Sequence, residues 1–343
     1  MKIQENVELA PLSYMNIGGQ GKYLIDIENE EELRKVEEIS REESLPVFVL
    51  GDGSNTIFSD GFHERVFVRI KTNGILKTYD SPGGANIDVD AGVNWDEFVQ
   101  WTIKNKLSGI ETLSGIPGTV GAAPIQNIGA YGQEVSNVIT HIRVYSLEDN
   151  EFYEISNEDC NFQYRDSIFK QNLGKFIITK ISFQLSKEKP KMPTYKNLAL
   201  HFLSKKNKDP NAKEIRNAVI EVRDSKLPDI NEKPNCGSFF GNPIVTISQA
   251  KELLEKFPDM PQFPTTDNAV KLQGGWLIEK AGFKGKEIGD NKKIIISSDS
   301  ALVLIALPGA TWNDLIKAKD TIIEGVGKNF GVRLEVEPNL ITN

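Results

Sequence analysis

An uncharged stretch with an unusual share of small residues lies at residues 113–132, which read LSGIPGTVGAAPIQNIGAYG. Glycine opens backbone conformations that other residues avoid, and it lets main-chain N–H groups approach a ligand closely. A run of this length and regularity predicts a backbone cradle for a large, flat or phosphorylated cofactor. The alternative is a tightly packed series of turns with no ligand.

A second candidate cradle, VLGDGSNTIF, occupies residues 49–58, directly after an apolar run that predicts a buried strand over 46–50. Small residues at the end of a strand can offer consecutive N–H groups to a pyrophosphate, although an ordinary turn has the same composition. Neither cradle fits the G-x-G-x-x-G fingerprint, since Thr56 stands where the last glycine belongs, and neither carries the Gly-Lys-Ser/Thr of a P-loop. A dinucleotide-type cofactor would therefore not be held in the usual Rossmann manner.

Together the two cradles resemble the FAD-binding domain of the vanillyl-alcohol-oxidase type, and more closely the UDP-N-acetylenolpyruvoylglucosamine reductase family. Further motifs of that family follow in the same order along nearly the whole chain. They are YRDSIF at 164–169, SKLP at 225–228, GSFFGNP at 237–243, GWLIE at 275–279 and LEVE at 334–337.

The mixed order of strand-like and helix-like segments predicts α+β domains rather than one repeating βαβ sheet. The resemblance implies two α+β subdomains of the FAD-binding domain, at residues 1–72 and 73–213, and an α+β substrate-binding domain at 214–343. The segment 186–213 reads as a loop-heavy linker, and the last predicted strand is 332–336. Further strands are predicted at 23–27, 66–70, 87–89, 142–145, 152–155, 176–185, 294–296 and 302–306, and helices after Asn29 and Asn94, near Glu214, and over 246–257 and 311–326.

The resemblance implies an oxidoreductase that uses non-covalently bound FAD and NADPH to reduce the enolpyruvyl ether of UDP-N-acetylglucosamine enolpyruvate. Such a reaction needs a cation at the substrate carboxylate and a general acid near the neighbouring carbon. Arg165 suits the first task because its planar fork binds carboxylates in two-bond fashion, although a structural ion pair with Asp166 or another acid would also explain it. Ser238 matches the family's proton donor, although by itself it reads as a turn residue.

A carboxylate near the end of the chain completes the implied catalytic set. The alternation of Leu334 and Val336 with charged residues predicts a strand with one polar face, which carries both Glu335 and Glu337. The family pattern selects Glu337, and a solvent-exposed face is the alternative. Two departures from the family lie nearby: Ser300 stands where some members carry Gln or His, and Pro338 follows the glutamate where a strand normally continues.

The remaining site residues are also carried over from the resemblance. Those implied to bind FAD are Gly51, Gly53, Ser54, Asn55, Thr56, Ile116, Pro117, Gly118, Thr119, Gly121, Ala122, Gln126, Asn127, Gly129, Ala130, Tyr131 and Gly132. Those implied to bind substrate are Tyr164, Tyr195, Lys226, Asn242 and Lys284. Tyr195 matches the mobile tyrosine of the family's longer branch, Lys226 matches a residue shared with the nicotinamide nucleotide, and Asn242 and Lys284 fall on the diphosphate and uracil side.

Composition limits the other possibilities. The net charge of −8 argues against a nucleic-acid partner, no apolar run reaches the length of a membrane span, and the N-terminus lacks the apolar core of a signal peptide. The only two cysteines, Cys160 and Cys236, give neither a disulfide framework nor a metal motif, and no metal is expected. We therefore expect a cytoplasmic monomer. A flavin-dependent oxidase, for which His63 is the nearest attachment candidate, and a nucleotide-sugar-binding protein without flavin are the alternatives.

Overall fold

The computed structural model describes residues 1–265 and 268–343. The chain forms two compact units, and each unit is built from three segments that are separate in the sequence. Unit 1 consists of Met1–Val7, Gly21–Asp52 and His63–Arg223, and unit 2 of Glu8–Gln20, Gly53–Phe62 and Asp224–Asn343.

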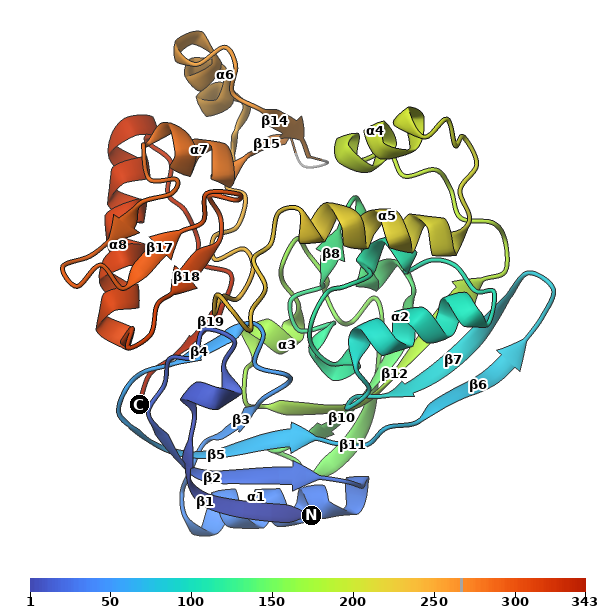
Figure 1. The fold of residues 1–343 in the computed structure, drawn as a ribbon. Coiled ribbons are helices and arrows are strands. Elements are labelled where there is room, and N and C mark those ends of the chain that lie inside the picture. Colours follow the sequence, from blue (N-terminus) through green and yellow to red (C-terminus); the bar gives the residue numbers. More distant parts are fainter. Residues whose placement is uncertain (266–267) are drawn as a thin grey trace. The chain divides into compact units, whose positions relative to one another are not determined.

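A four-stranded sheet in the order β1-β2-β5-β3 opens unit 1, and α1 follows its second strand along the chain (Figure 1). Its elements are β1 (Lys2–Glu8), β2 (Gln20–Ile27), α1 (Leu33–Glu42), β3 (Val47–Val49) and β5 (Phe62–Ile70). Asn29 accepts a hydrogen bond from the Glu32 N–H, as its predicted capping role requires. The strands predicted at 23–27, 46–50 and 66–70 are confirmed as β2, β3 and β5. The observed β2 and β5 are longer than predicted, and β3 is shorter.

A five-stranded antiparallel sheet in the order β11-β10-β12-β7-β6 forms the rest of the unit 1 core. Its strands are β6 (Ile75–Asp80), β7 (Gly84–Asp90), β10 (Ile139–Ser146), β11 (Glu151–Ser156) and β12 (Phe176–Ser186). Helix α2 (Trp95–Lys104) begins at the predicted cap Asn94 and buries Trp95 and Phe98, whose rings pack against Phe183 of β12. The short elements β8 (Gly129–Ala130), β9 (Gln133–Glu134) and α3 (Ile168–Gln171) complete this part of the unit.

Two helices follow β12 and pack around a small apolar cluster of their own. The first, α4 (Lys196–Ser204), lies inside the segment predicted to be loop-heavy, so that prediction is wrong for these nine residues. The second is α5 (Ala212–Asp224). Leu198 and Phe202 of α4 are buried against Ile215 and Val219 of α5, and this burial stabilises α4. The Lys- and Asn-rich sequence around α4 had predicted a loop instead.

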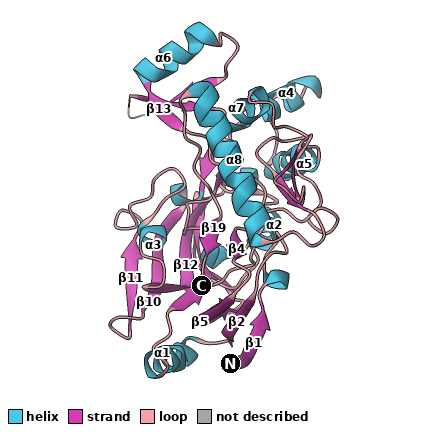
Figure 2. Ribbon diagram, turned by 90° about the vertical axis from the view of Figure 1, so that its left-hand side faces the viewer, coloured by secondary structure: helices cyan, strands magenta, loops and turns pink. Residues whose placement is uncertain are grey.

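Unit 2 contains two three-stranded sheets, β13-β15-β14 and β16-β17-β18, and a parallel pair of β4 with β19. The strands are β4 (Thr56–Phe58), β13 (Ile244–Thr246), β14 (Gln262–Pro264), β15 (Ala269–Leu272), β16 (Glu287–Ile288), β17 (Ile294–Ile296), β18 (Leu304–Ala306) and β19 (Asn339–Ile341). The helices, drawn in cyan in Figure 2, are α6 (Ile247–Lys256), α7 (Gly274–Lys280) and α8 (Trp312–Phe330). Helix α8 begins at a capping box of Thr311 and Asp314 and ends at Gly331, whose φ is 65°.

The predicted closing strand at 332–336 is wrong as an element. The expected alternation is present, since Val332 and Leu334 are buried while Arg333 and Glu335 are exposed. The backbone there forms only an isolated bridge at Val336, and the last strand is β19, which begins one residue after Pro338. Proline has no N–H and tolerates the start of a strand better than its interior, so it precedes the strand instead of ending it.

Short 3-10 helices connect several of these elements, at Ala10–Leu12, Glu30–Glu32, Glu111–Leu113, Val120–Ala122 and Val135–Asn137. Separate sheets and helices in both units make the chain an α+β protein, as predicted. None of the helices over the described ranges combines the length and apolar character that crossing a membrane requires.

Candidate active site

The cradle at 113–132 lies in unit 1 and is held at its start by the first turn of α2. The Trp95 N–H donates to the Gly118 carbonyl at 3.0 Å, and the Trp95 indole N–H donates to the Leu113 carbonyl at 3.0 Å. The Gly115 N–H donates to the Asp96 carboxylate at 2.6 Å. Three hydrogen bonds from two adjacent residues therefore fix six residues of loop.

The middle of this cradle leaves backbone donors for a ligand. Gly118 is buried with a φ of 120°, and its N–H and that of Thr119 donate to no acceptor in the part of unit 1 that the structure describes. Backbone N–H groups in folded proteins are rarely left without an acceptor, so these two donors suit an acidic or carbonyl group of a bound molecule. The Thr119 side chain accepts from the Ala122 N–H and so caps the 3-10 turn behind them.

The cradle at 49–58 begins in unit 1 and ends in unit 2. In unit 1 a Cβ at Gly51 would lie 3.1 Å from the Ala122 Cβ and 3.5 Å from the Thr119 hydroxyl, so the two cradles meet at this glycine. In unit 2 Gly53 has a φ of 73°, and a Cβ there would lie 1.8 Å from the Leu12 carbonyl oxygen, so only glycine fits. Ser54 follows it.

Asn55 connects the end of this cradle to the C-terminal segment of unit 2. Its carbonyl accepts from the Asn339 N–H at 2.9 Å, and its side-chain amide donates to the Glu337 carbonyl at 3.3 Å. Thr56 begins β4, which pairs with β19. The cradle therefore continues directly into the strand pair beside the predicted catalytic glutamate.

The second half of the long cradle forms a tight hairpin. Gly129–Ala130 pairs with Gln133–Glu134, and the two central residues, Tyr131 and Gly132, both have positive φ values of 54° and 88°. This combination is typical of a type I′ turn. It presents the Tyr131 side chain at the tip of the loop.

Both polar atoms of the Asn127 side chain are hydrogen-bonded to other residues of unit 1. Its amide donates to the Glu134 carboxylate at 2.9 Å and to the Gln163 carbonyl at 3.1 Å, and its oxygen accepts from the Ser136 N–H at 3.1 Å. Asn127 is buried and therefore fixes the shape of the cradle through these contacts.

Four further residues of the long cradle were implied to bind FAD: Ile116, Pro117, Gly121 and Gln126. Ile116 packs on the core of unit 1. Gly121 lies so close to Ala91 that a Cβ there would be 2.6 Å from the Ala91 side chain.

Arg165 lies at the tip of a tight turn in unit 1. The backbones of Gln163 and Asp166 exchange hydrogen bonds at 3.0 and 3.2 Å, and Arg165 between them has a φ of 57°. The guanidinium stands 5.5 Å from the centre of the Tyr164 ring, and a Cβ at Gly129 would lie 3.5 Å from its Nη1. The turn thus brings Tyr164 and Arg165 against the cradle.

The neighbouring Asp166 carboxylate accepts from the Gln171 amide at 2.6 Å. The alternative of a structural ion pair between Arg165 and an acid stays open. Lys170 reaches back to donate to the Arg165 carbonyl at 2.9 Å, which adds a second support to the strained turn.

Tyr195 contacts the cradle through a partner that the sequence did not reveal. Its ring meets that of Tyr131 edge-on, with the ring centres 5.4 Å apart, at the start of α4. Burial raises the pKa of the Tyr131 hydroxyl, the nearby Arg223 charge lowers it in part, and the net shift is upward. Tyr131 also packs on the apolar cluster of α4 and α5, so the hairpin and the Tyr195 segment are joined in unit 1.

In unit 2 the loop at 237–243, called the Ser238 loop here, pairs with the segment that carries Glu337. Ser238 bridges to Val303, and Phe240 bridges to Val336. The Glu337 N–H donates to the Phe239 carbonyl at 3.0 Å, and a Cβ at Gly241 would lie 3.6 Å from a Glu337 carboxylate oxygen. Glu337 is half-buried, whereas Glu335 is exposed.

Cys236, two residues before Ser238, is a protonated thiol in this surrounding. Burial, and to a lesser degree the negative charge of Glu337, raise the pKa of the thiol to about 12. A thiol with so high a pKa is a poor nucleophile, which fits the predicted role of a small filler.

The predicted substrate-binding residues of unit 2 have different environments. The Asn242 oxygen accepts from the Gly274 N–H at 2.9 Å and so caps α7. The Lys284 ammonium donates to the Glu279 carboxylate at 3.0 Å. Lys226 is exposed, and the Ser300 carbonyl accepts from the Val303 N–H at 3.0 Å beside the Ser238 bridge.

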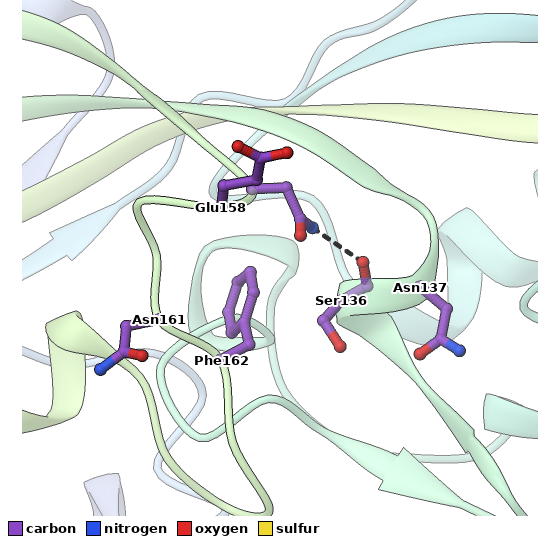
Figure 3. Close-up of a pocket in the computed structure, with 6 residues that line it drawn as sticks. Ser136, Asn137, Glu158, Asn161 and Phe162 are labelled. Atoms are coloured by element: carbon purple, nitrogen blue, oxygen red, sulfur yellow. Dashed lines mark hydrogen bonds between the residues drawn. The ribbon is translucent and has the colours of Figure 1, made fainter.

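Other features of unit 1 do not join the cradles. His63 is buried in β5, edge-on to Phe67 with the ring centres 6.1 Å apart. A polar pocket of about 380 Å³ is lined by Ser136, Asn137, Asn157, Glu158, Asn161 and Phe162 (Figure 3). It contains none of the predicted site residues. Over 1–265 and 268–343, no three His, Cys, Asp or Glu side chains are grouped so that they could hold a metal ion.

The cradles fit FAD by their own construction. They combine glycines at which a Cβ would collide with neighbouring atoms, Gly53 and Gly121, with the N–H donors of Gly118 and Thr119, which have no acceptor in the described part of unit 1. The model for the FAD binding domain matches residues 22–156, and fold and site together define a flavin-binding protein. The model for the C-terminal domain of UDP-N-acetylenolpyruvoylglucosamine reductase matches residues 229–341.

Whole-length comparisons identify the family. The chain is 37% identical to UDP-N-acetylenolpyruvoylglucosamine reductase of Flavobacterium johnsoniae over 99% of this chain and 100% of that one, and 35% identical to that of Pseudomonas aeruginosa over 99% of both. The crystal structure of that reductase from Thermus caldophilus has the same fold, with a TM-score of 0.66 and 23% identity over 99% of both chains. The chain belongs to the UDP-N-acetylenolpyruvoylglucosamine reductase family.

Proposed function

We propose that this chain catalyses the NADPH-dependent, FAD-mediated reduction of UDP-N-acetylglucosamine enolpyruvate to UDP-N-acetylmuramate, a step of peptidoglycan precursor synthesis that supports cell wall formation, cell shape and division. The observation that carries the proposal is similarity to reductases of this name over 99% of the chain at 37% identity. Bound FAD supplies the hydride chemistry, with NADPH as its source. The alternatives of an oxidase and of a flavin-free binding protein have no comparable support.

Unit 1 supplies the groups that hold the cofactor and the substrate carboxylate. The unpaired donors of Gly118 and Thr119 suit the polar groups of FAD. The Arg165 guanidinium, held beside Gly129 by its turn, would bind the enolpyruvyl carboxylate in two-bond fashion and stabilise the negative charge that develops there. Tyr164, which stacks on Arg165, and Tyr195, which stands on Tyr131, would contact the substrate beside it.

Unit 2 supplies proton delivery. The Ser238 hydroxyl would donate a proton to the carbon next to the carboxylate, and the half-buried Glu337 would orient or replenish that proton. Serine is a weak acid, so its transfer depends on fixed position, which the bridges at Ser238 and Phe240 provide. Lys226, Asn242 and Lys284 would contact the nucleotide part, and Lys284 would exchange its Glu279 partner for a phosphate or uracil oxygen.

Several finer points belong to the same proposal. The separate sheets of unit 1 support subdomains at 1–72 and 73–213, followed by the substrate-binding domain at 214–343. We propose a cytoplasmic monomer without a nucleic-acid or membrane partner, since the net charge is −8 and both cysteines are free thiols.

The direct test uses purified protein. It should be yellow, release its flavin on acid precipitation, and consume NADPH only when the enolpyruvyl nucleotide is added, with a product two hydrogens heavier by mass spectrometry. NADPH consumption that needs oxygen and not the nucleotide would contradict the proposal, and flavin that stays with the precipitated chain would contradict non-covalent binding.

A further inference from the structure

Two residues in the first turn of α2, Trp95 and Asp96, form hydrogen bonds with the start of the cradle at 113–132. Asp96 is the charged residue of the two. Trp95 contributes its two hydrogen bonds to Leu113 and Gly118, which are neutral and satisfied within one loop. Asp96 contributes a carboxylate oxygen to the Gly115 N–H at 2.6 Å. A carboxylate acceptor makes this the strongest of the three hydrogen bonds.

The same carboxylate is held by a third element, α5. Arg216 donates from Nη1 to Oδ1 at 2.5 Å and from Nη2 to Oδ2 at 2.7 Å, and Gln100 donates to Oδ2 at 3.1 Å (α2 and α5 are labelled in Figure 1). The side chains are only 16% and 25% exposed for Arg216 and Asp96. Burial by itself would raise the pKa of the Asp96 carboxyl, but the bonds from Arg216 and Gly115 outweigh it, and the pKa is lowered.

Gly115 is also confined by the side chains of α5. Its φ is 69°, and a Cβ there would lie 2.7 Å from the Ile220 side chain and 3.2 Å from Nε of Arg223, both on α5. The residue therefore sits between Asp96 and α5 in a conformation that favours glycine. The buried Gly118, whose N–H has no acceptor in the described unit, follows three residues later.

We propose that Asp96 is a positioning residue for the flavin: it joins α2, α5 and Gly115, and so keeps residues 115–118 in the shape that presents the N–H groups of Gly118 and Thr119 to the cofactor. The inference rests on the proposed function, which makes FAD the ligand. A loop that is ordered before binding loses less entropy on binding, and apparent affinity falls in proportion to the fraction of molecules in the competent shape.

The test compares Asp96→Asn with a matched control, Glu30→Gln. Glu30 also forms a two-bond pair with an arginine, Arg143, at 2.9 and 3.1 Å and accepts from the Thr179 hydroxyl at 2.6 Å. Neither member bonds to residues 113–118 within the described part of unit 1. Both substitutions replace a carboxylate with an amide of the same shape and weaken a two-bond pair with an arginine, but only Asp96→Asn also changes a contact with the cradle.

FAD is removed from each protein, and its dissociation constant is measured by titration, with thermal unfolding of the flavin-free proteins in parallel. For Asp96→Asn we expect Kd to rise roughly 10- to 100-fold, with turnover at saturating FAD within about twofold of the wild type because Asp96 reaches no reacting atom. For Glu30→Gln we expect a lower melting temperature and a Kd within about twofold of the wild type. A purely structural role for Asp96 would lower the melting temperature in the same way and leave Kd unchanged.

A folded Asp96→Asn protein that binds FAD as tightly as the wild type overturns this inference, and so does an equal loss of affinity in Glu30→Gln. A wild-type chain that binds no FAD overturns the proposed function instead. If Asp96→Asn does not fold, Arg216→Gln replaces it: it leaves the Asp96–Gly115 bond but removes the fork that orients the carboxylate. We then expect a smaller rise in Kd, and an unchanged Kd overturns the inference.

Discussion

The cradle at 113–132 in unit 1 and the Ser238 loop in unit 2 use their backbones in opposite ways. In the cradle, side chains of α2 hold the loop from outside, and the N–H groups of Gly118 and Thr119 are left without a protein acceptor in the described chain. In the Ser238 loop, the backbone is paired through bridges and through hydrogen bonds from 239 and 241, and the side chains are what remains to act. The proposed cofactor binding in unit 1 would thus depend on backbone shape, and the proposed proton delivery in unit 2 on particular side chains.

The largest effect should come from the C-terminal glutamates. Glu337→Gln should lower turnover by roughly 10²–10⁴-fold with substrate binding largely kept, because we propose that the half-buried carboxylate serves proton delivery. Glu335→Gln should change stability by about 0.5 kcal/mol or less, since that side chain is exposed. Turnover of both variants at saturating substrate is the measurement. An inactive Glu335→Gln would show that the wrong glutamate has been assigned.

A pair of glycines sharpens the contrast from the backbone side. Gly53 and Gly132 both have positive φ, 73° and 88°, but a Cβ at Gly53 would strike the Leu12 carbonyl at 1.8 Å, whereas one at Gly132 meets nothing within 4 Å. Gly132→Ala should therefore cost only the left-handed strain of about 1–2 kcal/mol. Gly53→Ala should cost more than about 4 kcal/mol, since backbone must move. Denaturant unfolding measures both, and equal losses would contradict this account of the cradle at 49–58.

The smallest effect is expected at the two thiols. Burial is the main cause that raises the pKa of both Cys160 and Cys236 to about 12, aided by the charge of Asp159 at the first and of Glu337 at the second. At pH 8 only roughly one thiol in ten thousand would then be ionised. Native protein should resist iodoacetamide at both positions, and unfolded protein should react at both, as read by mass spectrometry. Rapid labelling of native Cys236 would show that it is more than a filler.

The two regions also differ in how far sequence alone could predict them. The cradles stand out by composition, because a backbone site needs glycine and excludes charge, and the structure brings them together at Gly51 and Ala122. The family motif was needed to single out Ser238 and Glu337, since a serine in a turn and a glutamate on a polar face are common. Their roles remain proposals that the variants above test.

Long-range contacts explain most of what the sequence missed. The bond from Asp96 to Arg216 spans 120 residues, and the pairing of Tyr131 with Tyr195 crosses a segment that looked like linker. Helix α4 is stabilised by burial against α5 more than by its own composition, so local pattern did not reveal it. The strand predicted at 332–336 failed because alternation in burial arose without a continuous partner strand.

The proposed assignment of cofactor binding to unit 1 and proton delivery to unit 2 is tested most directly by Ser238→Ala in two separate half-reactions. Flavin content, and the rate at which NADPH bleaches the flavin absorbance, should stay within about twofold of the wild type, because the cradle is untouched. Return of the absorbance on adding the enolpyruvyl nucleotide should slow by roughly 10²–10⁴-fold, because the proton donor is gone. Equal slowing of both half-reactions, or no slowing of the second, would contradict the account.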